Sequence, residues 1–177
     1  MAAHVLMMSS WVASGHVGMS AAAPVLARLG HEVTLIPTII LSNHPGWPEV
    51  AGHVIPPDDI GAMIAALDGN GWLDDHQALL VGYMPSVEHV DRAARLIERI
   101  RNSAPAPLIV IDPIIGDTPK GLYVPEPVAT AIRDRLVPLA DILTPNLFEL
   151  GWLTSIDAPD LRGAVAAART LLRQGRC

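Results

Sequence analysis

The stretch LIVIDPIIGDTPKGLYVP, residues 108–125, decides the fold that we expect for this chain. It opens with four apolar residues and continues into Asp112-Pro, Gly-Asp117 and a Lys-Gly turn. A short strand without polar residues is typical of a parallel sheet that helices cover on both faces. Acidic residues just beyond such a strand are expected at the edge of the sheet where open α/β folds bind their ligands. The stretch therefore predicts an α/β fold and a ligand site near Asp112 and Asp117.

The composition excludes several classes of protein. Half of the 177 residues are hydrophobic and 17% are charged, which excludes a disordered chain and suffices for one domain with a core. The formal net charge of -6 argues against nucleic acid as a partner, because phosphate backbones attract basic patches. No apolar run approaches the roughly 20 residues of a membrane span, so no membrane contact is expected.

Cysteine usage and the first residues bear on the compartment. Cys177 is the single cysteine, so no disulfide is expected within the chain, and a cytoplasmic location is the prediction. Residues 1–15 lack the basic region of a signal peptide and favour a strand instead.

Apolar runs and turn signals alternate along the whole chain. Strands are expected at 4–9, 31–39, 77–84, 108–111 and, briefly, within 141–146. Helices are expected at 18–30, 57–73, 86–103 (with Ser86 as its cap), 126–140, 147–155 and 158–175 (with Gly175 at its end). Residues 41–57 are rich in Pro, Gly and Asn and predict a loop. Alternating strands and helices indicate βαβ units and a doubly wound, mostly parallel sheet in three layers.

Three turns carry weak signals with two interpretations each. The glycines of GHVGMSA (15–21) either bring backbone N–H groups to a ligand or make a plain tight turn. Ser42, Asn43 and His44 either contact a polar ligand or serve the turn itself. Tyr83 either stacks on an aromatic ligand or covers the end of the core.

The acids after two neighbouring strands carry a stronger signal. Asp112 and Asp117 follow one strand, and Thr144, Asn146 and Glu149 follow the next. Each group has a local explanation, since Asp-Pro and Gly-Asp start turns, Thr or Asn can cap the following helix, and Glu149 would then be an acid in its first turn. Their coincidence at one edge favours a Mg²⁺ ion bound through water, as in phosphate-transfer sites. The sequence contains no Walker A motif, no dinucleotide-binding glycine fingerprint, no zinc-ligand spacing and no nucleophile elbow.

Five segments occur in the order and spacing of the pyridoxal kinases of the ribokinase-like superfamily, and the chain resembles that family from about Val5 onward. The segments are GHVGMSAAAPVLARLGHEV, LSNHPGW, VGYMPS, IDPIIGDTPKGLYVPEPV and LADILTPNLFEL. The resemblance implies transfer of the γ-phosphate of Mg-ATP to the 5′-hydroxymethyl of pyridoxal, which gives pyridoxal 5′-phosphate in vitamin B6 salvage. It also implies a homodimer.

The resemblance assigns a role to each matching residue. Ser10 matches the position that contacts the pyridine ring, His44 the loop histidine beside the substrate, and Tyr83 the pocket tyrosine. Tyr123 matches the tyrosine of the family's G-x-Y-V motif. Pro45 departs from the pattern, because many relatives carry a threonine there.

The second group of matching residues corresponds to the family's positions near the nucleotide phosphates and the metal ion. Asp112 and Asp117 match the acidic pair near the nucleotide phosphates. Thr144, Asn146 and Glu149 match the T-P-N-x-x-E group, and Asp112 with Glu149 would hold Mg²⁺ through water.

The G-x-G-D motif, in which the family carries its general base and its anion hole, is absent from the 177 residues. We therefore expect residues 1–177 to form the N-terminal portion of a single ribokinase-like domain that lacks its C-terminal portion, and to be inactive alone. Two alternatives remain: a hydroxymethylpyrimidine-type kinase, and a non-catalytic fragment or degenerate paralogue that at most binds pyridoxal.

Overall fold

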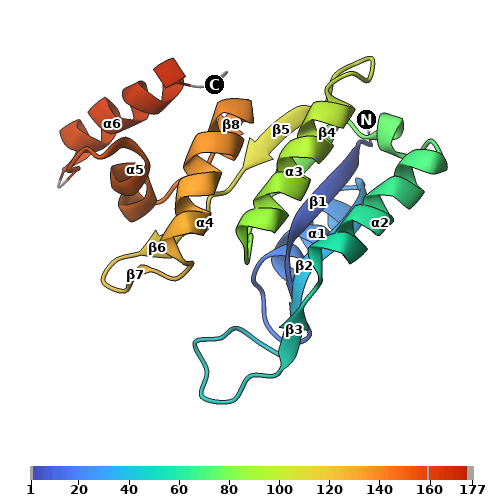
Figure 1. Cartoon of the computed structure of the whole chain (residues 1–177), viewed down its shortest axis with the longest axis horizontal. Helices are drawn as coiled ribbons and strands as arrows, with labels where there is room; N and C mark the ends of the chain where they lie inside the picture. The colour runs from blue at the N-terminus through green and yellow to red at the C-terminus, as the bar shows by residue number, and fades with distance from the viewer. Residues whose placement is uncertain (1, 159, 175–177) are drawn as a thin grey trace.

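A six-stranded sheet organises the computed structural model, which describes residues 2–158 and 160–174. The strand order is β3-β2-β1-β4-β5-β8, and every neighbouring pair is parallel except β2 with β3 (Figure 1). The strands are β1 His4–Val12, β2 Glu32–Leu41, β3 Gly52–Val54, β4 Ala78–Val81, β5 Leu108–Ile111 and β8 Ile142–Leu143. A separate two-stranded hairpin joins β6 Gly116–Asp117 to β7 Gly121–Leu122.

Helices connect the parallel strands. They are α1 Met19–Arg28, α2 Pro57–Gly69, α3 Val87–Ile100, α4 Glu126–Ala131, α5 Leu147–Thr154 and α6 Leu161–Gln174. Because crossover connections between parallel strands are right-handed, α1 covers one face and α2, α3 and α4 cover the other (Figure 1). The predicted α/β fold with a mostly parallel sheet is confirmed. Among the described helices, none is long and apolar enough to cross a membrane.

The core forms where the sequence pattern predicts it. The strand expected at 108–111 is observed with those bounds, and its Ile109 and Ile111 are fully buried. Helix α3 buries one stripe of its surface, with a spacing that places its apolar residues on one face. The buried members of this stripe are Val90, Ala93, Leu96, Ile97 and Ile100.

Two local expectations were wrong, and one element was missed. The loop expected at 41–57 contains the short strand β3, whose three residues are all exposed and so carry no apolar signal. The hairpin β6–β7 was not expected. Ser86 precedes α3, but its hydroxyl bonds the side chains of Glu88 and His89 at 2.6 and 2.8 Å and caps no backbone N–H.

The helix expected at 126–140, with its end near Pro138, is confirmed in extent but is not α-helical throughout. It changes to a π-helical turn at Ile132–Leu136 and then to a 3₁₀ turn at Val137–Leu139, where Pro138 lacks the N–H that would continue the α-helix. The predicted stop at Gly175 lies outside the described residues, as does Cys177.

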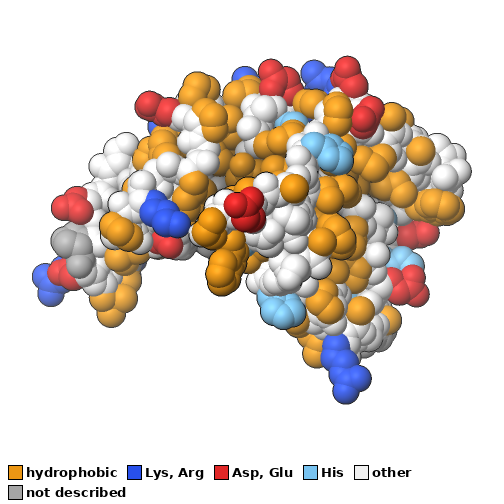
Figure 2. Space-filling model, turned by 90° about the horizontal axis from the view of Figure 1, so that it is seen from below, with side chains coloured by type: hydrophobic (Ala, Val, Ile, Leu, Met, Phe, Trp, Pro, Cys, Tyr) orange, Lys and Arg blue, Asp and Glu red, His pale blue; other side chains and the backbone are white. Residues whose placement is uncertain are grey.

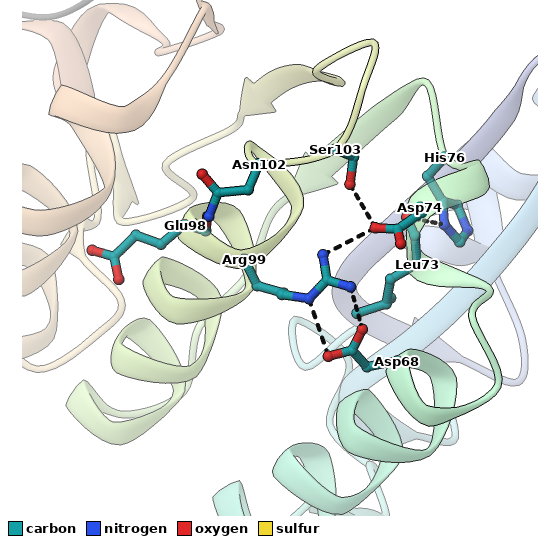
Figure 3. Close-up of polar contacts among 8 residues, drawn as sticks. All are labelled: Asp68, Leu73, Asp74, His76, Glu98, Arg99, Asn102 and Ser103. Atoms are coloured by element: carbon teal, nitrogen blue, oxygen red, sulfur yellow. Dashed lines mark hydrogen bonds and ion pairs between the residues drawn. The ribbon is translucent and has the colours of Figure 1, made fainter.

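A cluster of charged side chains links α2 to α3. Arg99 on α3 donates to Asp68 of α2 at 3.1 Å and to Asp74 at 2.9 Å, and Ser103 also donates to Asp74 (Figure 3). The bonds from Arg99 and then Ser103 lower the pKa of Asp74. This cluster holds α2 and α3 together on one face of the sheet, and its polar groups form their hydrogen bonds with one another.

Replacing Ile97 by alanine tests the packing of α3. The side chain is fully buried, so Ile97→Ala is expected to lower the free energy of unfolding by roughly 2 to 5 kcal/mol. Arg95→Ala, at an exposed position of the same helix, is the matched control and should stay within about 0.5 kcal/mol of the wild type. Urea unfolding followed by circular dichroism measures both. Equal effects of the two variants would contradict the packing described here.

Candidate active site

A cavity of about 530 Å³ opens at the carboxyl ends of β1, β2 and β4, at the edge of the sheet seen from below in Figure 2. Hydrophobic side chains occupy much of that face in the space-filling view. The volume lies within the range of small-molecule sites. Five of the residues singled out from the sequence line the cavity: Ser10, His44, Tyr83, Asp117 and Tyr123.

The cavity lies beside a bulge in β2. The register between β1 and β2 shifts between Ser9 and Ser10, and Thr38 is the residue that is skipped. Ser10, the first residue of β1 after the shift, lines the cavity, and within the described residues its hydroxyl has no hydrogen-bond partner. Bulges of this kind re-aim a side chain at functional sites.

Tyr83 is held by two buried side chains that the sequence analysis did not identify. Its N–H donates to the Ser9 hydroxyl at 3.1 Å, and its carbonyl accepts from the Thr38 hydroxyl at 2.8 Å. Ser9 and Thr38 are 2% and 0% exposed, so both bonds are sheltered from water. Burial raises the pKa of the Tyr83 phenol. A glycine precedes Tyr83 because a Cβ at Gly82 would lie 2.3 Å from the Ser9 hydroxyl oxygen.

The glycine turn before α1 is both tight and part of the cavity wall. Gly18 has a φ of 54°, and a Cβ there would lie 2.4 Å from the Ser10 hydroxyl oxygen. The glycine is therefore required by the close approach of the turn to β1.

The polar residues of the loop at 41–47 have two roles: some shape the loop, and one lines the cavity. The Ser42 hydroxyl donates to Asn43 at 2.6 Å and accepts the N–H of Ala51 at 3.0 Å, so these two residues shape the loop. His44 lines the cavity, and its Nδ1 accepts the N–H of Gly46 at 3.0 Å. This bond leaves Nε2 as the ring nitrogen that is free to meet a ligand.

Asp112 and its neighbours form a second group beside the cavity. Burial raises the pKa of Asp112, and a hydrogen bond from Thr144 opposes that shift. Asp117 belongs to the cavity lining instead, and its carboxylate accepts the N–H of Thr118 at 2.7 Å. Tyr123 joins the two groups, because burial and then the charges of Glu149, Asp117 and Asp112 raise its pKa.

Glu149 is the buried member of the second group, with 2% of its surface exposed. Its carboxylate accepts the N–H of Ile115 at 2.8 Å and the N–H of Asn146 at 2.9 Å. The Asn146 side chain accepts the N–H of Glu149 at 2.9 Å and donates to the Gly116 carbonyl at 2.8 Å. The pair is thus a capping box that starts α5, which confirms the cap expected at Asn146 and the place of Glu149 in the first turn, where Glu149 also accepts a backbone N–H. Burial, with a further contribution from the Asp112 charge, raises the pKa of Glu149.

The second group is suited to a divalent cation held partly through water. Within the described ranges, no three His, Cys, Asp or Glu side chains are placed to enclose a metal ion. Asp112 and Glu149 are nonetheless two desolvated carboxylates that repel each other's charge. Mg²⁺ keeps several waters and takes one or two carboxylates, which fits this pair. Both Glu149 oxygens already accept N–H groups, so Asp112 is the better direct ligand.

The fold and the two groups together define a class of protein: a doubly wound α/β protein whose ligand site lies at the carboxyl ends of parallel strands. A family model described as phosphomethylpyrimidine kinase matches residues 18–177. The chain therefore belongs to the phosphomethylpyrimidine kinase family.

Individual relatives sharpen the comparison and confirm the resemblance to pyridoxal kinases. The chain is 43% identical over 171 residues to a pyridoxine/pyridoxal/pyridoxamine kinase of Bordetella avium, covering 97% of this chain and 58% of that protein. It is 39% identical to a pyridoxal kinase of Granulibacter bethesdensis, of which it covers 62%. The chain thus spans about three-fifths of the length of these relatives.

Solved structures give the same result for the fold. The pyridoxal kinase of Leishmania donovani in complex with ADP and pyridoxamine superposes with a TM-score of 0.92 at 34% identity, covering 97% of this chain and 59% of that one. A phosphomethylpyrimidine kinase of Clostridium difficile shares the fold, with a TM-score of 0.84 at 20% identity.

Replacing Asp112 by asparagine tests its desolvation. Because the pKa of Asp112 is raised on folding, the folded chain holds this proton to higher pH than the unfolded chain. Stability is then lost as pH rises from the ordinary aspartate pKa through the raised one. Asp112→Asn should match the wild type near pH 3.5 and become the more stable protein toward pH 7. Urea unfolding across this range without divalent cations measures the difference, and a gap that does not change with pH would rule out the assignment.

Two substitutions of Asn146 separate its two bonds. Asn146→Ala removes the cap and the bond to Gly116 and should lower the free energy of unfolding by roughly 1 to 2 kcal/mol. Asn146→Ser keeps a capping oxygen and should recover most of this loss. Thermal and urea unfolding measure both variants. If serine were as damaging as alanine, the cap would not be the main contribution of Asn146.

Proposed function

We propose that this chain is the N-terminal portion of a pyridoxal kinase that acts on pyridoxal and Mg-ATP, transferring the γ-phosphate to the 5′-hydroxymethyl group. The observation that carries this proposal is the adjacency of two different sites, which meet at Tyr123. One is an apolar cavity with a few polar groups, and the other is a pair of desolvated carboxylates. Phosphoryl transfer needs both a place for the acceptor and a charge-bearing site for the phosphates.

The cavity would bind the vitamer through three side chains. The Ser10 hydroxyl is free to bond a ring substituent, and the Tyr83 ring supplies an apolar face beside it. His44 closes the cavity from the loop, with Nε2 free. Ser9 and Thr38 position the Tyr83 backbone and do not line the cavity themselves.

The carboxylate group would serve the nucleotide. We assign Asp112 and, through water, Glu149 to Mg²⁺, and Thr144 and Asn146 to the neighbourhood of the phosphates. The ion, when bound, neutralises phosphate charge in the transition state. Asp117 lies in the cavity lining, between this group and the vitamer. ATP as the phosphate donor is supported by the ADP present in the Leishmania relative.

A hydroxymethylpyrimidine kinase is the second candidate. The matching family model carries that class in its description, and it spans residues 18–177. Both substrates are substituted six-membered aromatic heterocycles with a hydroxymethyl group. The Bordetella, Granulibacter and Leishmania relatives, each more than 30% identical to this chain, are named as kinases of pyridoxal, which favours the first candidate.

Titration with small molecules tests the proposal. Pyridoxal and pyridoxine should bind the chain more tightly than hydroxymethylpyrimidine, followed by vitamer absorbance and tryptophan fluorescence. Tyr83→Ala should weaken vitamer binding at least tenfold, or about 1.4 kcal/mol, by removing a wall of the cavity. Trp72→Ala removes an exposed aromatic residue that is not part of the cavity lining and is the control. Tighter binding of the pyrimidine than of every vitamer would move the assignment to the second candidate.

Turnover separates binding from catalysis. We expect no pyridoxal 5′-phosphate from the 177-residue polypeptide with Mg-ATP, because its sequence contains no G-x-G-D. Product formation would show that the cavity and the carboxylates suffice. A cytoplasmic location, where Mg-ATP is available, and a homodimer are part of the same proposal.

A further inference from the structure

The chain contains a single lysine, Lys120, and it lies in the wall of the cavity. It sits in the turn between β6 and β7, which contributes Asp117, Thr118, Pro119 and Lys120 to the lining. Every other Lys or Arg position of the sequence is an arginine, and among the described lining residues Lys120 is the one basic side chain besides His44. The cavity therefore holds the one side chain of this protein that ends in a primary amine.

The amine of Lys120 is not committed to another group. Within residues 2–158 and 160–174 it has no hydrogen-bond or ion-pair partner, although Asp117 is three positions away. Asp117 is instead bonded to the N–H of Thr118. The residue is exposed, so its flexible stem can swing across the mouth of the cavity. A structural role in an ion pair would have fixed it in place.

We propose that Lys120 captures the aldehyde of pyridoxal as a Schiff base in this cavity. The inference rests on the proposed function, since it requires that the cavity bind B6 vitamers. The neutral amine, having lost its proton to water, adds to the aldehyde carbon, and a proton moves from nitrogen to the aldehyde oxygen. Loss of that oxygen as water leaves a C=N bond, so aldehyde and amine give imine and water with no change of oxidation state.

The capture has a consequence for the acceptor hydroxyl. In water, the 5′-hydroxymethyl group of pyridoxal closes onto its own aldehyde as a cyclic hemiacetal. Binding the aldehyde to Lys120 opens that ring and frees the hydroxyl. Pyridoxine has an alcohol and pyridoxamine an amine at the same carbon, so neither can form this bond. Lys120 is thereby a residue that favours pyridoxal over the other two vitamers.

Reduction with borohydride tests the proposal directly. The full chain is incubated with pyridoxal, reduced, and analysed by mass spectrometry of the intact protein and its peptides. The expected result is one pyridoxyl group on the peptide that contains Lys120. Labelling should saturate with pyridoxal, and excess pyridoxine should lower it at least tenfold. The α-amino group is the other primary amine of the polypeptide, and its labelling, which pyridoxine should leave unchanged, is the internal reference.

Two variants separate covalent capture from charge. Lys120→Arg keeps the cation but cannot form the imine, and Lys120→Met removes both. The ratio of pyridoxal affinity to pyridoxine affinity should fall at least tenfold in both. If Lys120→Arg kept the wild-type ratio and only Lys120→Met lowered it, the lysine would act as a charge, and the proposal would be overturned.

The remaining outcomes distinguish this inference from the proposed function. Labelling of Lys120 that is no greater than that of the α-amino group and insensitive to pyridoxine would mean solution chemistry of an exposed amine. If pyridoxine nevertheless changed the tryptophan fluorescence saturably, the cavity would bind vitamers and only the inference would fail. If no vitamer bound at all, the proposed function would fail with it.

Discussion

The carboxylate of Glu149 joins two parts of the fold that carry the site. It accepts one backbone N–H from Ile115, beyond β5, and one from Asn146, before α5. Buried N–H groups that lose their acceptor have no water to replace it, so each bond is costly to break. The same capping box places the Asn146 amide on the Gly116 carbonyl, at the start of the hairpin β6–β7. One side chain thus fixes the hairpin that forms a wall of the cavity and sits beside Asp112 in the carboxylate group.

The parallel strands and their helices could be predicted because both faces of the sheet are covered. Runs such as Leu108–Ile111 need no tertiary information to be read as buried strands. The hairpin β6–β7 could not be predicted in this way, since it depends on contacts with parts of the chain outside the hairpin. A Cβ at Gly116 would lie 2.3 Å from the Phe148 ring on α5, which shows how closely that helix packs on the hairpin. Strand β3 is similar, as its three exposed residues form a strand only against β2.

The site was predictable in part, and for different reasons at different residues. The acids after β5 and β8 follow from strand order alone, and the capping box is a local sequence signal. Ser10 followed from resemblance alone, whereas the local sequence of His44 and of Tyr83 left a ligand contact as one of two interpretations, which the resemblance then favoured. Ser9 and Thr38 were missed, since buried hydroxyls that hold a neighbouring backbone look like ordinary strand residues. Their roles appear only once the register shift between Ser9 and Ser10 is seen.

The two desolvated carboxylates and the lysine lie in different parts of the site. Asp112 and Glu149 are both desolvated, and the charge of Asp112 also raises the pKa of Glu149, which makes the group unfavourable in the folded chain without a cation. A basic side chain packed against them would relieve that strain permanently and remove the attraction for a divalent ion. The one lysine of the protein lies instead in the cavity wall, unpaired, and no arginine is part of the described lining. Under the proposed function, the amine would lie on the side of the vitamer and the two desolvated carboxylates on the side of the metal ion, with Asp117 in the cavity wall near Lys120.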